Sequence, residues 1–62
     1  MIPLPEQIEA VEREIRLRET HYPRWVAQGK LTYDAAAREV ERMKAVRETL
    51  LTLQVQAALS AA

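Results

Sequence analysis

The sequence contains no cysteine, so the chain can form neither a disulfide nor a thiolate metal site. It contains one histidine, His21, and no acidic residues cluster around it, so a metal site is not expected. A chain of 62 residues buries too little apolar surface to be very stable alone. We therefore expect one small domain without metal or cofactor, stabilised by association with a second copy or with a partner.

Excess charge of one sign and long apolar runs are also lacking. Nine basic and nine acidic residues give a net charge of zero, which argues against broad electrostatic binding to nucleic acid or an anionic membrane. No apolar run approaches the length of a membrane span, and the opening "MIPLPEQ" lacks the basic and apolar regions of a signal peptide. We expect a cytoplasmic location and no membrane association.

Proline and glycine are scarce, and they mark the boundaries of two predicted helices. Pro5 suits a first helical position, whereas Pro3 keeps the chain before it extended. Gly29, the single glycine, follows the last periodic residue, where a left-handed residue ends a helix, and Thr32 is a good N-cap for the next one. The expected fold is all-α, an antiparallel two-helix hairpin in one domain, 1–62, with an extended arm over 1–5, helices over 5–28 and 33–59, and a turn over 29–32.

The first predicted helix has a heptad seam. Its two rows, each with seven-residue spacing, are Ile8, Ile15 and Tyr22, and Val11, Arg18 and Trp25. The seam stays in phase across Pro23, which favours a continuous helix kinked there over a helix that stops and restarts. Arg18 interrupts the seam and needs a carboxylate, either Glu14 or one across the interface. Three i, i+4 pairs support the helix: Glu9 with Arg13, Glu12 with Arg16, and Glu14 with Arg18.

The second predicted helix is apolar on more than one side. Its expected inner face is Ala36, Val40, Met43, Val46, Leu50, Leu53 and Ala57, and Ala35, Ala36 and Ala37 would lie opposite the bulky Tyr22 and Trp25. After Thr49 no charged residue occurs, and Leu51, Val55 and Leu59 form a second stripe. Burying a leucine-sized side chain contributes about 1.5–3 kcal/mol, so a second copy or a target protein is expected to cover this stripe. The simplest arrangement is a homodimeric four-helix bundle, with self-association through Leu50, Leu51, Leu53, Val55 and Leu59.

The segment "HYPRWVAQGK" carries the residues most typical of a binding site. Tyr22, Arg24 and Trp25 have the composition of a protein-binding hot spot, although the pattern favours Tyr22 and Trp25 filling the hairpin corner while Arg24 faces water, and both can hold at once. His21 has no cysteine or second histidine as a partner, and the only serine, Ser60, lies near the end of the chain. A solvated or capping histidine is expected, and an enzyme is not.

The segments "YPRWVAQGKLT" and "AAREVERMKAV" resemble short helical proteins encoded by bacteriophages and prophages. The matching residues are Tyr22, Pro23, Arg24, Trp25, Val26, Gly29, Leu31, Thr32, Ala36 and Met43. The resemblance covers somewhat more than half of the chain and implies a phage context without any activity. The start of "GKLTYDAAAREV" also resembles bacterial helix-turn-helix domains, but the uninterrupted "VERMKAVRETLLTL" leaves no room for a recognition helix.

Together these patterns predict a non-enzymatic interaction protein that binds and modulates, by inhibiting or redirecting, a host or phage protein. The alternative is a small dimeric nucleic-acid-binding regulator that uses Arg13, Arg16, Arg24 and Lys30.

Overall fold

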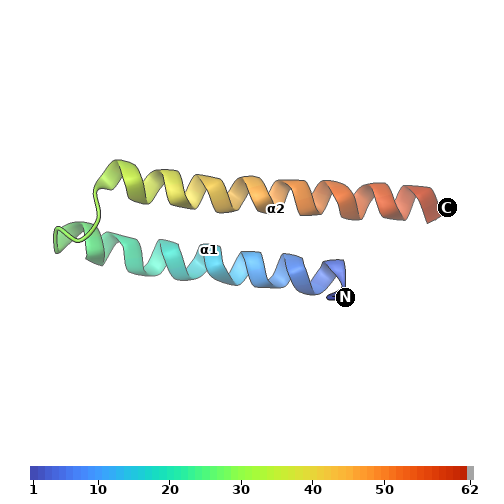
Figure 1. The fold of residues 1–62 in the computed structure, drawn as a ribbon, viewed down its shortest axis with the longest axis horizontal. Helices are drawn as coiled ribbons and strands as arrows, with labels where there is room; N and C mark the ends of the chain where they lie inside the picture. The colour runs from blue at the N-terminus through green and yellow to red at the C-terminus, as the bar shows by residue number, and fades with distance from the viewer. Residues whose placement is uncertain (62) are drawn as a thin grey trace.

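A computed structural model describes residues 1–61 as two long antiparallel helices. Helix α1 spans Leu4–Ala27 and helix α2 spans Tyr33–Ala61, and no strand forms within the described residues. A tight turn joins them at one end, so both ends of the chain lie at the other (Figure 1). The all-helical hairpin predicted from the sequence is therefore confirmed.

The ends of α1 differ from the prediction by one residue each. The helix begins at Leu4, with Pro3 as an N-cap that makes no side-chain capping bond and Pro5 in the first turn. It ends at Ala27, and the next residues form a Schellman motif. In this motif the N–H of Gly29 donates to the Val26 carbonyl (3.0 Å) and the N–H of Lys30 donates to the Trp25 carbonyl (2.9 Å). Gly29 has a φ of +73°, which explains why the only glycine stands here.

Helix α2 begins as the sequence predicts and ends two residues later than expected. The Thr32 hydroxyl accepts a hydrogen bond from the N–H of Ala35 (3.1 Å), which caps the helix. Asp34 places a negative charge in the first turn, where the helix dipole favours it. The helix continues to Ala61 because nothing after Leu59 interrupts it.

Pro23 lies inside α1, which runs through it without a break. The alternative of a helix that stops and restarts at the proline is therefore wrong. A proline has no N–H to donate to the carbonyl four residues earlier, so one helical bond is missing at Glu19. The end of α1 is still held by the Schellman bonds from Gly29 and Lys30.

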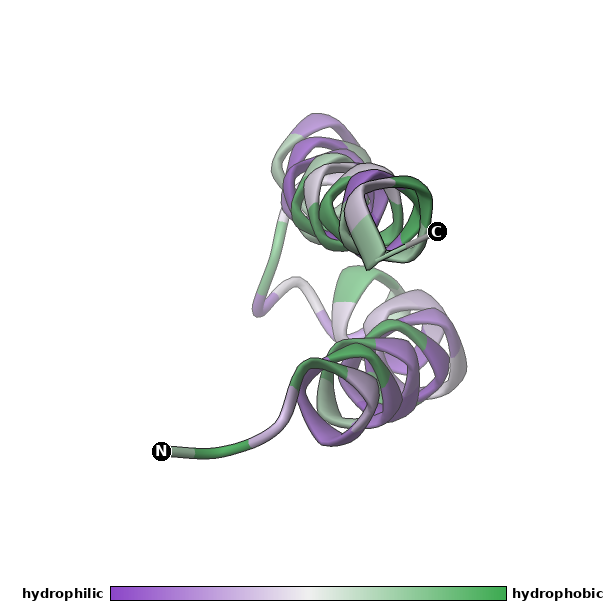
Figure 2. Ribbon diagram, turned by 90° about the vertical axis from the view of Figure 1, so that its right-hand side faces the viewer, coloured by the Kyte–Doolittle hydropathy of each residue, from purple (hydrophilic) through white to green (hydrophobic). Residues whose placement is uncertain are grey.

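The core is a narrow seam between the helices. Ile8, Ile15 and Ala36 are buried, and Tyr22 and Met43 are half-buried. Seen along the helix axes, the outward side of α1 is mostly hydrophilic, whereas the C-terminal end of α2 is more hydrophobic (Figure 2). The first row of the predicted seam on α1 therefore lies where the sequence places it.

Beyond Met43 the predicted inner face of α2 holds at Leu50, which is half-buried, but is wrong at Val46 and Leu53. Val46 and Leu53 are 44% and 47% exposed, while Arg47 is half-buried. A step of three residues turns a helix by about −60° and a step of four by about +40°, so a line that faces one neighbour must alternate the two. From Val40 the line reaches Met43 after three residues and Arg47 after a further four. The apolar pattern instead takes a second step of three, from Met43 to Val46.

Helix α2 projects beyond the start of α1 (Figure 1). The Arg18 side chain of α1 meets Glu39 of α2, which sets the register of the antiparallel pair. Counting along both helices from this contact, Leu4, the first residue of α1, lies near the level of Leu53. No part of α1 therefore lies beside Ala57 or Leu59. Ala57, which the sequence placed on the inner face, is exposed for this reason.

Candidate interaction surfaces

Arg18 joins the two helices. Its Nε donates to Oε1 of Glu14 (2.8 Å), and its Nη1 donates to the Glu39 carbonyl (3.1 Å) and lies 3.4 Å from Oε2 of Glu39. The hydrogen bond to Glu14 raises the pKa of Arg18 above its ordinary value against the opposing effect of desolvation, with smaller contributions from the negative charges of Glu14 and Glu39. Both partners proposed for this seam arginine, Glu14 and a carboxylate across the interface, are therefore present, and Arg18 stays charged.

Other charged pairs lie along the hairpin. Arg42 pairs with Glu39 (2.9 Å), and Lys44 lies 3.9 Å from both Glu19 and Glu41. Among residues 1–61, the predicted i, i+4 pairs of Glu9 with Arg13 and Glu12 with Arg16 do not come within 4.0 Å. Exposed ion pairs of this kind contribute little to the free energy of unfolding, so the fold loses little stability when these side chains stay unpaired in water.

The end of α1 carries an aromatic corner formed by His21, Tyr22 and Trp25. The rings of His21 and Trp25 stack with centroids 6.0 Å apart and an interplanar angle of 18°. Tyr22 and Trp25 lie 5.5 Å apart and are tilted by 39°. Tyr22 is half-buried, His21 is exposed, and Trp25 keeps 40% of its surface in water. The corner is thus anchored on the seam by Tyr22 and open to solvent at Trp25.

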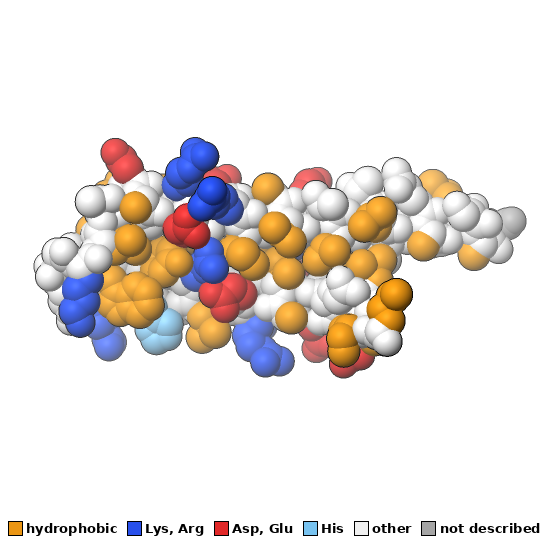
Figure 3. All heavy atoms as spheres, viewed as in Figure 1, with side chains coloured by type: hydrophobic (Ala, Val, Ile, Leu, Met, Phe, Trp, Pro, Cys, Tyr) orange, Lys and Arg blue, Asp and Glu red, His pale blue; other side chains and the backbone are white. Residues whose placement is uncertain are grey.

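A shallow hollow of about 250 Å³ adjoins this corner. It is lined by Glu14, Leu17, Arg18, His21, Tyr22 and Trp25. On the face seen in Figure 3, apolar side chains follow the line between the helices and a charged group interrupts them. Arg24, the third residue of the predicted hot spot, is exposed in the last turn of α1, where a positive charge suits the helix dipole.

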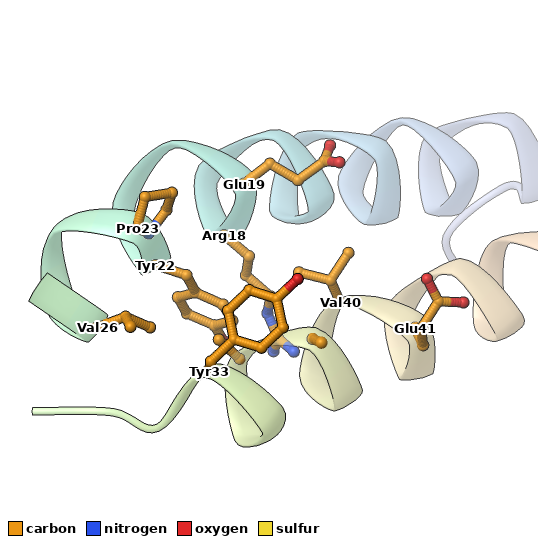
Figure 4. Close-up of a pocket in the computed structure, with 10 residues that line it drawn as sticks. Arg18, Glu19, Tyr22, Pro23, Val26, Tyr33, Val40 and Glu41 are labelled. Atoms are coloured by element: carbon orange, nitrogen blue, oxygen red, sulfur yellow. The ribbon is translucent and has the colours of Figure 1, made fainter.

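A larger groove lies on the other side of the hairpin end, and we call it the end groove. It encloses about 540 Å³ and is lined by Arg18, Glu19, Tyr22, Pro23, Val26, Tyr33, Ala36, Ala37, Val40 and Glu41. Tyr22 from α1 and Tyr33 from α2 extend into the space between the helices, with Val40 beside them and Glu19 on the α1 rim (Figure 4). Ala36 and Ala37 line the groove on the α2 side, and their small side chains leave this space open.

The C-terminal stripe, formed by Leu51, Val55 and Leu59, is mostly uncovered. Leu51 is half-buried, but Val55 and Leu59 are 58% and 72% exposed. The projecting end of α2 shows no charged side chain on the face seen in Figure 3. Of the other residues expected to mediate self-association, Leu50 is half-buried in the hairpin and Leu53 is exposed.

The structure separates the two sets of predicted site residues. Tyr22, Arg24 and Trp25 lie together at the turn end, whereas the C-terminal stripe lies at the opposite end of α2. The end groove and Tyr33, which is 76% exposed, did not appear among the predicted site residues. The sequence does contain a signal for this surface. Tyr33 and Leu51 are 18 residues apart, and this spacing places both on one side of a helix.

Comparison of the chain with protein-family models, curated proteins and solved structures finds no match. Within the described residues, neither helix is long and apolar enough to cross a membrane. In the same part of the chain, no three His, Cys, Asp or Glu side chains come together as a group that could hold a metal ion.

Proposed function

We propose that this protein is a small non-enzymatic interaction module, encoded by a phage and acting in the bacterial cytoplasm, that binds and modulates a host or phage protein. Its binding site is the aromatic corner together with Arg24. The observation that carries the proposal is the half-exposed Trp25, held between His21 and Tyr22 near the end of α1. Tryptophan, tyrosine and arginine are the residues most enriched in protein-binding hot spots.

The corner is suited to a partner because its rings are already ordered. Stacking against Trp25 fixes His21, and the seam fixes Tyr22, so little side-chain entropy is lost on binding. The shallow hollow beside the corner provides an apolar surface with carboxylate and guanidinium groups at its edge. A protein with an apolar side chain flanked by polar groups would match this surface.

Self-association completes the proposed module. Two hairpins pack into a homodimeric four-helix bundle, and the missing helical bond at Pro23 bends the end of α1. The support for this dimer is the large exposed area of the C-terminal stripe, while among residues 1–61 only Ile8, Ile15 and Ala36 are buried.

Capture of a partner from bacterial lysate tests the corner. The immobilised wild-type chain is compared with Trp25→Ala and, separately, Val55→Glu, and a protein that is captured is then purified and its dissociation constant measured. We expect Trp25→Ala to weaken binding at least tenfold, as truncation of a hot-spot tryptophan does. Equal affinities for wild type and Trp25→Ala would reject the corner, and loss with Val55→Glu alone would move the partner to the tail.

Nucleic-acid binding is a second candidate. Arg13, Arg16, Arg24 and Lys30 are all exposed, and among residues 1–61 none of the four lies within 4.0 Å of a carboxylate. Binding through these groups would weaken steeply with salt, because each phosphate contact releases condensed counterions. Fluorescence anisotropy with labelled DNA and RNA between low and physiological salt tests this, and no signal at low salt removes the candidate.

A further inference from the structure

The end groove and the C-terminal stripe share one side of α2. Tyr33 is 18 residues before Leu51, and Ala37 is 18 residues before Val55. Eighteen residues make five full turns of an α-helix, so the members of each pair leave the helix in the same direction, about 27 Å apart along its axis. One side of α2 thus has a hollow at its beginning and protruding apolar side chains at its end.

We infer that this side of α2 binds a second copy of the chain in antiparallel orientation, with the C-terminal stripe of each copy in the end groove of the other. This inference rests on the self-association in the proposed function and specifies its geometry. A two-fold axis makes both contacts equivalent. Val55 of one copy then lies at Ala37 of the other, Leu59 lies beside Tyr33, and Leu51 lies at the level of Glu41.

The groove and the stripe are complementary in shape and polarity. Ala37 leaves room at the point where Val55 arrives, and Tyr33 offers an exposed ring at the point where Leu59 arrives. The stripe has i, i+4 spacing, which is the spacing of Tyr33 and Ala37 on the groove side. Side chains with matched spacing on antiparallel helices can interdigitate as knobs into holes.

Charges at the centre of this side of α2 favour the antiparallel orientation. Lys44 and Glu48 are equally far from the two-fold axis, so Lys44 of each copy faces Glu48 of the other. Glu48 has no ion-pair partner among residues 1–61, and the 3.9 Å pairs of Lys44 with Glu19 and Glu41 are long. A parallel arrangement would place Lys44 against Lys44 and Glu48 against Glu48, and such like-charge contacts disfavour it.

The exposed surface of the hairpin has the size that such a dimer needs. A compact monomer of 7.1 kDa exposes about 4,100 Å², whereas this chain exposes 4947 Å². The excess, about 850 Å², is close to the roughly 800 Å² that each partner loses in a standard interface. A second copy on this side of α2 would bring the surface per chain to that of an ordinary compact fold.

Disulfide cross-linking tests the proposed register, because the natural chain has no cysteine. The double variant Ala37→Cys, Val55→Cys cannot close a disulfide within one copy, since its two cysteines are about 27 Å apart and a disulfide needs Cα atoms within about 7 Å. The matched control Arg38→Cys, Gln56→Cys has the same spacing, but its two side chains point about 100° away around α2 from those of Ala37 and Val55. After mild oxidation we expect most of the first variant, and little of the control, to be a covalent dimer. Equal yields would overturn the inference.

A charge-pair experiment without cysteines gives a second readout on purified protein. Sedimentation of wild type should give twice 7.1 kDa, whereas Ala37→Lys and Val55→Glu should each be monomeric. Mixed in equal amounts, these two variants should form a heterodimer, because one contact then pairs the new lysine with the new glutamate and the other contact is native. Circular dichroism confirms that each variant remains helical.

The outcome of the charge-pair experiment is independent of the capture experiment. A wild-type chain that stays monomeric at all concentrations, or a mixture that stays monomeric, would overturn the dimer and leave binding at Trp25 intact. A dimer that forms as expected, in a chain that captures nothing, would reject the partner-binding corner and leave the dimer intact.

Discussion

Replacing Ile15 by alanine tests the seam at its best-packed point. Ile15 is the most buried apolar side chain, with 3% of its surface exposed, at a central position of α1. Three carbon atoms leave the seam, and at about 0.8 kcal/mol each their lost burial amounts to about 2.4 kcal/mol. The space between only two helices can collapse or admit water, so the cavity adds little. We expect a loss of about 2–3 kcal/mol in the free energy of unfolding, at the low end of buried isoleucine truncations.

Thermal unfolding followed by circular dichroism measures this loss. A chain of 62 residues has an unfolding entropy of about 130 cal/mol/K, so the Tm should fall by roughly 15–23 °C. Leu17→Ala is the matched control on the same helix, because Leu17 is 45% exposed and its truncation should change the Tm by less than about 4 °C. Both are compared at one protein concentration, since association shifts the Tm. Similar falls for the two variants would refute a core in which Ile15 is packed and Leu17 is not.

Three further substitutions address the turn and the orientation of α2. Gly29→Ala should lower the free energy of unfolding, measured by urea denaturation, by about 1 kcal/mol. The cost comes from the backbone, because φ is +73° while no atom lies within 4 Å of the added Cβ. Gly29→Asn should cost less, because asparagine tolerates a positive φ, and equal costs would contradict this backbone origin. Thr32→Ala should cost about 1 kcal/mol in the same assay through loss of the hydrogen bond to the Ala35 N–H, with Thr52→Ala in the middle of α2 as the neutral control. Val40→Ala should cost roughly 1 kcal/mol, more than twice the cost of Val46→Ala, because Val40 faces the seam and Val46 is 44% exposed; the reverse order would restore the inner face that the apolar pattern favours.

The elements could be predicted from the sequence because local signals fix their ends. Gly29 permits the left-handed residue of the Schellman motif, and Thr32 supplies the cap of α2, and both act within a few residues. The seam of α1 could also be predicted. Ile8 and Ile15 are seven residues apart, charged residues surround them in the sequence, and both are buried in the structure.

The orientation of α2 beyond Met43 could not be predicted in the same way. Its second half is apolar on several sides, so the hydrophobic pattern does not single out one face. The polar contact of Arg18 with Glu39 helps to set the register, and Arg47 then lies in the seam although its type argues against it. A hydrophobic count cannot find a seam that is partly formed by arginine side chains, whose stems bury apolar surface while their charged ends stay polar.

The two proposed surfaces are compatible because they lie on different sides of the hairpin. The end groove and the hollow beside the aromatic corner share only Arg18 and Tyr22, and Trp25 lines the hollow but not the groove. A second copy in the end groove would therefore leave Trp25 free. In the antiparallel dimer the two turn ends point in opposite directions, so two corners lie at opposite ends of a body about as long as the 50 Å hairpin. Such a dimer binds a partner with two sites of matching separation far more tightly than either corner alone, since the second contact becomes intramolecular. Val55→Glu would then weaken capture of a two-site partner by loss of this avidity, yet leave the affinity of one corner for a single-site fragment unchanged.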